Sequence, residues 1–226
     1  MKANKILTEI QIKTLKAISK TKLAEFYYWT GGTALAYKYL PARLSEDLDF
    51  FSFDLETDEN LLIELNKLKK ELKIKKINFT KHLNRQQFIF EFDKNNKLKL
   101  EFVFFPFINL QKMLFDKELG IKIDTLVDIA TNKTLATYQR NEPKDIFDLY
   151  FLLTIKKFKL ANLIKNVDKK FGVKINQSDL EVKILNNIDL LKNIKPLVLE
   201  SKKLDIEKIR KYFTNQSIKH LKTFIF

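Results

Sequence analysis

The sequence predicts an α+β protein, with a mixed β-sheet in the N-terminal part and only helices in the C-terminal part. Strand-like segments are confined to residues 26–105, and every periodic segment after Pro106 is compatible with a helix. The 226 residues are 45% hydrophobic and include 20 Phe, enough to close a sizeable core in one large domain or two small ones. We therefore expect an α/β lobe at residues 1–105 and a helical lobe at residues 106–226.

The first elements predict a strand, a glycine turn and a helix. Apolar residues at helical spacing indicate a leading helix at residues 4–24. The aromatic run at residues 26–29 favours a short strand, which ends at Thr30-Gly31-Gly32. Residues 33–40 return to a helix-compatible pattern before Pro41.

The later segments continue the sheet and then leave it. Alternating apolar residues predict strands at residues 48–53, 74–80, 86–92 and 98–104, with an amphipathic helix at 59–72 and a hairpin turn at 93–96. Beyond Pro106, helices are expected at residues 125–138, 143–155, 160–171, 177–188 and 206–213. We expect the two lobes to pack together and the helical lobe to complete an active cleft.

The charge of the chain favours a polyanionic partner. There are 42 Lys and Arg residues against 28 Asp and Glu residues, a formal net charge of +14, which concentrates nucleic acid near the surface. All but four of the basic residues are lysines, which suit attraction to a phosphate backbone more than base recognition. An AT-rich gene, which encodes Lys, Asn and Ile abundantly, is the alternative explanation.

The composition also excludes several kinds of site and places the protein in the cytoplasm. The absence of cysteine excludes disulfides, thiol nucleophiles and zinc sites built on cysteine. His82 and His220 lack the spacing of metal ligands or of a catalytic triad. We expect a cytoplasmic protein with no membrane partner, because no segment resembles a signal peptide or a membrane span.

Asp47 and Asp49 are the strongest candidates for catalysis. One residue separates them, so on an extended strand both side chains leave the same face. The two carboxylates repel each other unless a cation lies between them, and oxygen ligands suit Mg²⁺ or Mn²⁺ better than zinc. A solvated acidic turn is the alternative for such a pair considered alone.

The glycine turn changes this balance. Gly31 and Gly32 let the backbone approach a phosphate closely, and the helix that follows favours negative charge, so Gly31, Gly32 and Thr33 are candidates for binding a nucleotide. A turn with no ligand is the alternative for these glycines alone. Followed by the Asp47 and Asp49 strand, the turn predicts a site for a metal ion and a triphosphate.

At this point the sequence resembles the AbiEii/AbiGii-type toxins of the nucleotidyltransferase superfamily. The resemblance rests on four motifs: residues 30–36, residues 43–51, the segment Asn132-Lys133-Thr134-Leu135-Ala136, and the segment Lys144-Asp145-Ile146-Phe147-Asp148-Leu149-Tyr150. It implies a nucleotidyltransferase-like N-terminal lobe, and it implies that Lys133 contacts phosphate and that Asp145 is catalytic. The last roughly 70 residues match no motif.

Other residues have weaker support. Lys133, Thr137 and Arg140 share one helical face, so two cations lie in a stripe that suits phosphates. The alternative role for Asp145 is to complement the dipole at a helix N-terminus. The roles of Asp145 and Asp148 are also interchangeable at this point.

Three further residues have an ordinary alternative as well as a functional one. Glu101 is a candidate third carboxylate or part of an exposed ion-pair stripe with Lys97 and Lys99. Arg43 is expected to pair with Asp47 or to contact the triphosphate, and Ser45 to bind phosphate or to cap the turn.

These inferences predict transfer of a nucleoside monophosphate from an NTP, with Mg²⁺ or Mn²⁺ held by Asp47 and Asp49. The resemblance implies the toxin of a toxin–antitoxin or phage-defence system, an RNA acceptor such as the tRNA 3′ end, and a cognate antitoxin as partner. The alternatives are a protein hydroxyl as the acceptor, and a catalytically silent RNA-binding module.

Overall fold

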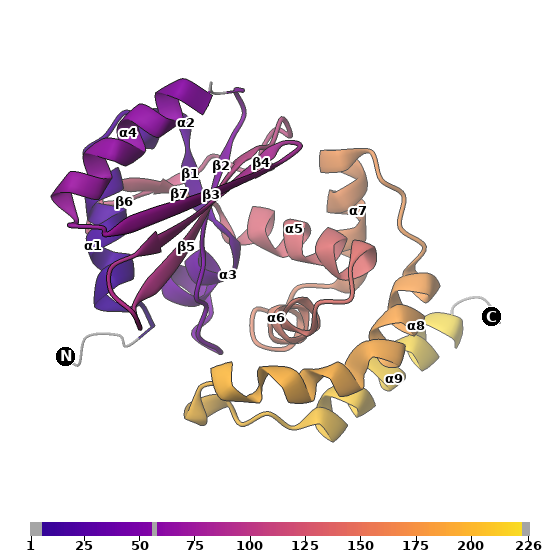
Figure 1. Ribbon diagram of the computed structural model, residues 1–226. Helices are drawn as coiled ribbons and strands as arrows, with labels where there is room; N and C mark the ends of the chain where they lie inside the picture. The colour runs from indigo at the N-terminus through magenta and orange to yellow at the C-terminus, as the bar shows by residue number, and fades with distance from the viewer. Residues whose placement is uncertain (1–5, 56–57, 223–226) are drawn as a thin grey trace. The chain divides into compact units, whose positions relative to one another are not determined.

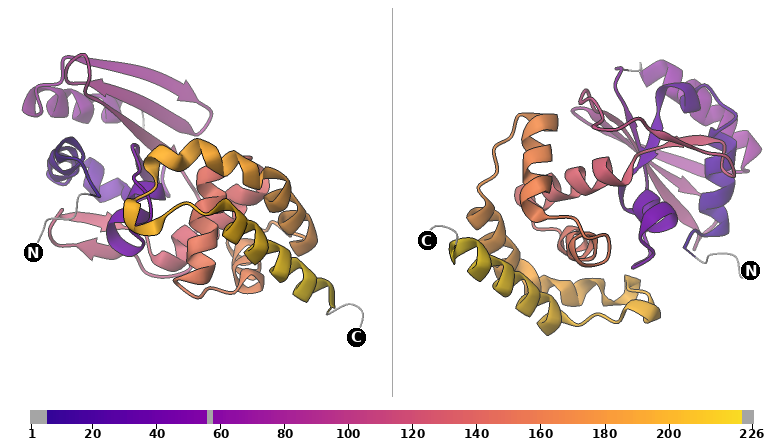
Figure 2. Two further views of the ribbon diagram at one scale, coloured as in Figure 1. Left: turned by 90° about the horizontal axis from the view of Figure 1, so that it is seen from below. Right: turned by 180° about the vertical axis from the view of Figure 1, so that it is seen from behind.

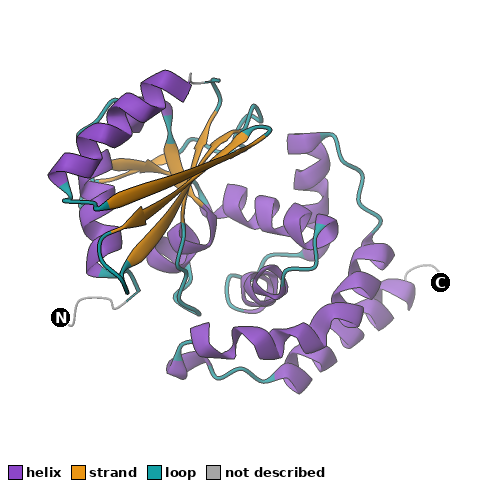
Figure 3. Ribbon diagram, viewed as in Figure 1, coloured by secondary structure: helices purple, strands orange, loops and turns teal. Residues whose placement is uncertain are grey.

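The computed structural model describes residues 6–55 and 58–222, and it divides the chain into two compact units, Met1–Leu126 and Val127–Phe226 (Figure 1). The first unit contains the sheet and the second is helical, which confirms the α+β fold class (Figure 3). The boundary lies later than residues 105 and 106, because two strands that the sequence did not predict still belong to the first unit.

The described part of the first unit forms a seven-stranded mixed sheet in the order β3-β4-β5-β2-β1-β7-β6. The strands are β1 (Tyr28–Thr30), β2 (Leu48–Ser52), β3 (Lys76–His82), β4 (Arg85–Glu91), β5 (Lys97–Phe104), β6 (Leu114–Asp116) and β7 (Ile121–Ile123). The expectation of helices alone after Pro106 is therefore wrong for residues 114–123. There a hairpin, closed by Gly120 at φ +70°, extends the sheet.

Strand β2 carries Asp49 and lies between β5 and β1 in the sheet. It runs antiparallel to β1 and parallel to β5, with Asp49 directly beside Glu101. Because side chains alternate along a strand, Leu48 and Phe50 are fully buried, whereas Asp49 lies on the opposite face. The sequence prediction that the two apolar residues hold the strand while the acids point away from the core is confirmed.

Short helices complete the first unit: α1 (Glu9–Ile18), α2 (Leu23–Phe26), α3 (Gly31–Ala34), the π-helical η1 (Leu35–Tyr39) and α4 (Asp58–Glu71). The helix expected over residues 4–24 begins later and is broken, because Thr8 and Gln11 form a capping box and residues 19–22 form a turn. Residues 4 and 5 lie outside the described part. Helices α1 and α4 contact each other and lie on one side of the sheet (Figures 1 and 2).

The second unit contains the helices α5 (Leu126–Gln139), α6 (Pro143–Thr154), α7 (Leu160–Phe171), α8 (Gln177–Asn187), η2 (Ile188–Leu197), η3 (Glu200–Lys202) and α9 (Ile206–Lys222). Helix α9 continues well beyond the predicted end at residue 213 and runs beside α8 (Figure 2). Phe147, Leu163 and Phe213 are fully buried in the core. Across residues 6–55 and 58–222, no helix is both long enough and apolar enough to span a bilayer.

Candidate active site

The glycine turn and the second aspartate form one local structure. Gly31 follows β1 with φ +78°, a left-handed conformation that glycine adopts without steric cost. A Cβ atom placed on Gly31 would overlap the carboxyl group of Asp49, leaving only 2.7 Å to its Cγ atom. The carboxylate therefore lies directly against the backbone of the turn, and only glycine leaves room for it.

Gly32 also lies against the side chains of predicted site residues, here Arg43 and Ser45. A Cβ atom there would lie 2.8 Å from Nη2 of Arg43 and 3.0 Å from Oγ of Ser45. Arg43 is 3% exposed and donates from Nη1 to the carbonyl of Leu44 at 3.0 Å, so its guanidinium is held against the turn. The structure thus brings Arg43, Ser45 and the two glycines together.

Two residues earlier in the sequence hold the backbone of Asp47 and of the two residues before it. The fully buried hydroxyl of Thr33 donates to the carbonyl of Asp47, so Thr33 has a positioning contact. Gln11 on α1, 2% exposed, donates from Nε2 to the carbonyls of Ser45 at 3.0 Å and Glu46 at 3.1 Å. Sequence reasoning missed Gln11, although Thr8 three residues earlier is the sequence signature of a capping box.

Two cations, Lys99 and Arg85, form ion pairs with Asp47 and Glu101. Lys99 lies 2.9 Å from Oδ2 of Asp47 and 3.0 Å from Oε1 of Glu101, and Arg85 lies 3.1 Å from Oε2 of Glu101. Although burial alone would lower it, these hydrogen bonds to Asp47 and Glu101 raise the pKa of Lys99. Glu101 is 7% exposed, so it does not belong to an exposed stripe.

The donor set suits a hard divalent cation bound together with a substrate. Asp47 and Asp49 are both partly exposed and supply carboxylate oxygens beside the turn. Among residues 6–55 and 58–222, no group of three or more His, Cys, Asp or Glu side chains forms a metal cluster. Mg²⁺ is commonly held by one or two carboxylates plus substrate phosphates and water, an arrangement that this pair fits.

A second charged group lies in the helical unit and brings together the other predicted residues. Nζ of Lys133 is 2.8 Å from Oδ1 of Asp145 and 2.8 Å from Oδ2 of Asp148. Arg140, just past the end of α5, donates from Nε to Oδ2 of Asp145 at 2.7 Å. Both cations of the predicted stripe therefore contact carboxylates of α6.

This second group is buried and its charges are balanced. The side chain of Asp145 is fully buried, and those of Asp148 and Lys133 are 4% and 10% exposed. Although burial alone would raise it, Lys133 and Arg140 lower the pKa of Asp145 to about 2. Asp145 is therefore an ionised partner of two cations and does more than complement the helix dipole.

Comparisons with known proteins agree with this fold. The family model described as "Nucleotidyl transferase AbiEii toxin, Type IV TA system" matches residues 13–218. An uncharacterized protein of Aquifex aeolicus (strain VF5) is 29% identical over 167 residues, which cover 73% of this chain and 76% of that protein.

Two solved structures from Helicobacter pylori share the fold. One carries a provisional nucleotidyltransferase assignment and superposes with a TM-score of 0.62 at 20% identity, covering 94% of this chain and 98% of its own. The other, JHP933, gives a TM-score of 0.61 at 19% identity, covering 96% of this chain and 94% of its own.

Proposed function

The chain belongs to the AbiEii family of nucleotidyl transferase toxins of type IV toxin–antitoxin systems, and from this premise we propose that it transfers a nucleoside monophosphate from an NTP to RNA. Membership makes the chain a nucleotidyltransferase and implies a cognate antitoxin. The proposal concerns the acceptor, the metal and the roles of individual residues, and it places the reaction in the cytoplasm.

The observation that carries the proposal is the contact between the Asp49 carboxylate and the Gly31 backbone. A carboxylate oxygen suited to a metal ion thus lies against the backbone of the glycine turn, and Asp47 and Glu101 lie on the same sheet face. Asp47 and Asp49 would hold Mg²⁺, or Mn²⁺ in its place, and Gly31 and Gly32 would receive the triphosphate. The bound ion would supply charge neutralisation on the phosphate oxygens.

In the proposed reaction, a hydroxyl oxygen of the acceptor attacks the α-phosphorus of the NTP. A P–O bond forms to the acceptor, the bond from the α-phosphorus to the bridging oxygen breaks, and pyrophosphate leaves with the electron pair. Glu101, which pairs with Asp49 across the sheet, would receive the hydroxyl proton. Arg43, held against Gly32, and Ser45 would orient the triphosphate.

Lys133 is assigned a role in the same reaction, in which its ammonium offsets charge on the triphosphate. Its contacts with Asp145 and Asp148 hold the ammonium in one position. Asp145 and Asp148 are therefore positioning residues in this proposal, and Arg140 supports Asp145. A Lys133→Met, Asp49→Asn double variant that loses no more activity than the worse single variant would support action in one step.

RNA is preferred as the acceptor because the chain carries a formal net charge of +14. A field of this sign attracts a polyanion from solution and raises its rate of encounter. The 3′ end of tRNA is the acceptor that we propose within this class.

The test is to incubate the protein with total RNA, Mg²⁺ or Mn²⁺ and each α-labelled NTP in turn, with the RNA and protein fractions resolved afterwards. Label in one RNA size class would identify the acceptor and the NTP. Label in a protein fraction would overturn the RNA assignment, and no pyrophosphate release under any condition would overturn the reaction.

The matched variants are Asp49→Asn and Asp54→Asn, which remove one carboxylate each from the same region of the chain. Asp54 is exposed, just past the end of β2. Asp49→Asn should reduce the rate by roughly a thousandfold, the size of effect seen when a preorganised electrostatic contact to the transition state is removed. Equal activity of the two variants would contradict the site.

A further inference from the structure

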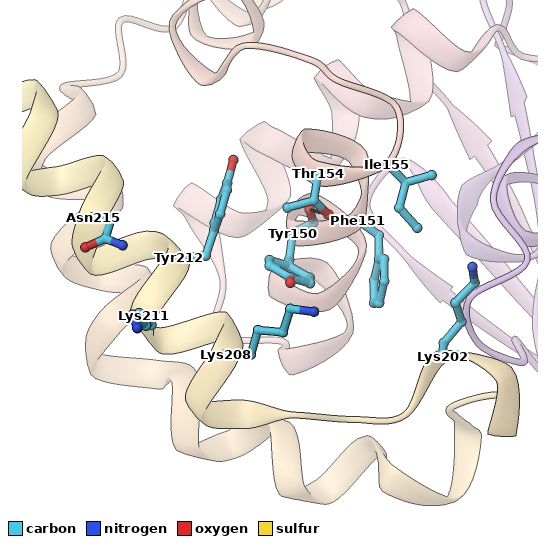
Figure 4. Close-up of a pocket in the computed structure, with 9 residues that line it drawn as sticks. All are labelled: Tyr150, Phe151, Thr154, Ile155, Lys202, Lys208, Lys211, Tyr212 and Asn215. Carbon is cyan, nitrogen blue, oxygen red and sulfur yellow. Dashed lines mark hydrogen bonds between the residues drawn. The ribbon is translucent and has the colours of Figure 1, made fainter.

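A pocket of about 540 Å³ lies in the helical unit between α6, α9 and η3 (Figure 4). This volume lies within the roughly 300–1,000 Å³ range typical of ligand sites. The residues that give it its character are three aromatic side chains and three lysines: Tyr150, Phe151, Tyr212, Lys202, Lys208 and Lys211. It contains none of the carboxylates or the lysine assigned to the transfer reaction.

The aromatic side provides a stacking platform. Tyr150 and Tyr212 meet edge to face, with ring centroids 5.4 Å apart and an interplanar angle of 83°. Tyr150 is 7% exposed and is held by the core, whereas Tyr212 is only partly buried and its ring reaches into the pocket (Figure 4). Planar bases stack on aromatic rings of this kind with little regard to sequence.

The lysine side provides positive charge, and the lining itself contains no acidic side chain. Lys208 and Lys211 are exposed and Lys202 is partly exposed, and within the described part of the chain none of the three forms an ion pair. The nearby carboxylate of Asp205 accepts a hydrogen bond at 2.9 Å from the backbone N–H of Lys208 at the start of α9. The lining of the pocket thus has three lysines and no acidic residue, although Glu200, Asp205 and Glu207 lie close by in the sequence.

We propose that this pocket binds unpaired nucleotides of the acceptor RNA, with a base stacked on Tyr212 and backbone phosphates on the three lysines. The inference rests on the proposed RNA acceptor and names the part of the protein that holds it. Combined aromatic stacking and lysine contacts to phosphates are the usual means of binding single-stranded nucleic acid. A duplex keeps its bases stacked inside, so it has no base to offer to Tyr212.

The arrangement of the lysines favours a strand over a free nucleotide. Lys208 and Lys211 are one turn apart on α9, and Lys202 comes from a separate segment. In Figure 4 the three follow one another along the lower edge of the pocket, below the aromatic rings. Successive phosphates of a strand can contact lysines of two separate segments, whereas a free NTP concentrates its phosphates at one end. Both ligands combine a base with phosphate, so competition by a free NTP must be measured.

The experiment measures binding of a short fluorescein-labelled oligoadenylate, and of a blunt RNA duplex, to the full chain by fluorescence anisotropy. Tyr212→Leu removes the aromatic face but keeps an apolar side chain, and Tyr212→Phe keeps the face without the hydroxyl. Tyr212→Leu should weaken single-strand binding at least about fivefold, from the usual strength of base stacking. Tyr212→Phe should bind like the wild type, and duplex binding should be the same for all three proteins.

The charge is tested with a double variant, Lys208→Gln with Lys211→Gln. Its control is Lys165→Gln with Lys169→Gln, which removes the same charge from exposed positions on α7. The pocket variant should lower the slope of log affinity against log salt by about 1.4, from about 0.7 for each single-strand phosphate contact. The control should lower it little. Equal slopes for the two double variants would overturn the proposal.

Two further outcomes separate this inference from the proposed function. If RNA is labelled in the transfer assay but the Tyr212 and lysine variants bind like their controls, the pocket assignment fails and the RNA acceptor stands. If no RNA is labelled but Tyr212→Leu still weakens oligoadenylate binding, the acceptor fails and the pocket stands as an RNA site. Displacement of the oligoadenylate by ATP, with Tyr212→Leu weakening both ligands equally, would assign the pocket to free nucleotides and overturn the proposal.

Discussion

The two charged groups of this protein are built from similar residues but differ in exposure. In the sheet unit, Asp47 and Asp49 are partly exposed beside a glycine turn, and Lys99 bridges Asp47 and Glu101 at its surface. In the helical unit, Asp145 is fully buried and shares its two oxygens between two cations. The carboxylates of Asp47 and Asp49 are open to solvent, whereas those of the second group are held by burial and by ion pairs.

This difference predicts that substitutions will separate activity from stability. A partly exposed carboxylate near solvent costs little to alter in the free protein, because water replaces its partners. A buried ion keeps its desolvation cost when its partner is removed. The sheet group should therefore respond to mutation mainly in catalysis, and the helical group in both catalysis and folding.

The largest effect on folding is expected for Lys133→Met. It leaves the buried carboxylates of Asp145 and Asp148 with one cation fewer, so the free energy of unfolding should fall by about 3 kcal/mol. Chemical denaturation measures this, with Lys165→Met at an exposed position of α7 as the control. If both variants unfold alike, the buried group does not stabilise the helical unit.

The next largest effect is expected for Gly31→Ala, in catalysis. The added Cβ atom would displace the Asp49 carboxylate, and misplacing a reacting group by about 1 Å can lower a rate roughly a hundredfold, about 2.7 kcal/mol. Gly172→Ala is the matched control, because Gly172 has a similar φ of +66° with nothing within 4 Å of the new atom. Both variants share the backbone cost, so unequal transfer rates isolate the contact with Asp49.

The residues of both charged groups could be predicted from the sequence better than the side chains that contact them. The spacing of Asp47 and Asp49 places both side chains on one strand face, and the glycines mark the turn that receives Asp49. These are local rules. The contacts of Arg85 and Lys99 with Glu101 depend on which strands pair and in which register, and periodicity does not encode pairing between distant strands.

The missed hairpin and the late start of the leading helix have local causes. Strands β6 and β7 have three residues each, too short for an alternating pattern to stand out, and only the glycine at position 120 marked their turn. Thr8 marked the true start of α1, but the apolar period continued on both sides of it. The catalytic roles of the site residues stay predictions.

A smaller effect is expected from acid, and it concerns the helical group alone. The pKa of Asp145 falls from its ordinary value of 3.8 to about 2 in the folded protein. A depressed carboxyl pKa adds stability above the unfolded value, and this stability is lost as pH falls through the folded value. About 2 kcal/mol should therefore disappear between about pH 4 and pH 2. Asp145→Asn should lose less stability across this range than wild type.

The control for the acid experiment is Asp168→Asn, at an exposed position on α7. As the pH is lowered from 4 to 2, the free energy of unfolding of this variant should decrease as steeply as that of the wild type. If Asp145→Asn also keeps the full slope between pH 4 and pH 2, the buried carboxyl is not ionised in the folded protein, and the ion pairs with Lys133 and Arg140 are not its state in solution.

The smallest effect is expected for Gln11→Met, which keeps the volume but removes the amide that donates to the carbonyls of Ser45 and Glu46. Leaving these carbonyls without their donor, and the Thr8 N–H without its acceptor in the capping box, should cost about 1–2 kcal/mol of stability. A purely structural role would lower stability alone. If Gln11 positions the loop before Asp47, the variant should also bind Mn²⁺ more weakly, measured by calorimetry without NTP or RNA. Unchanged Mn²⁺ affinity at reduced stability would restrict Gln11 to the fold and leave Thr33 as the residue that fixes the Asp47 backbone.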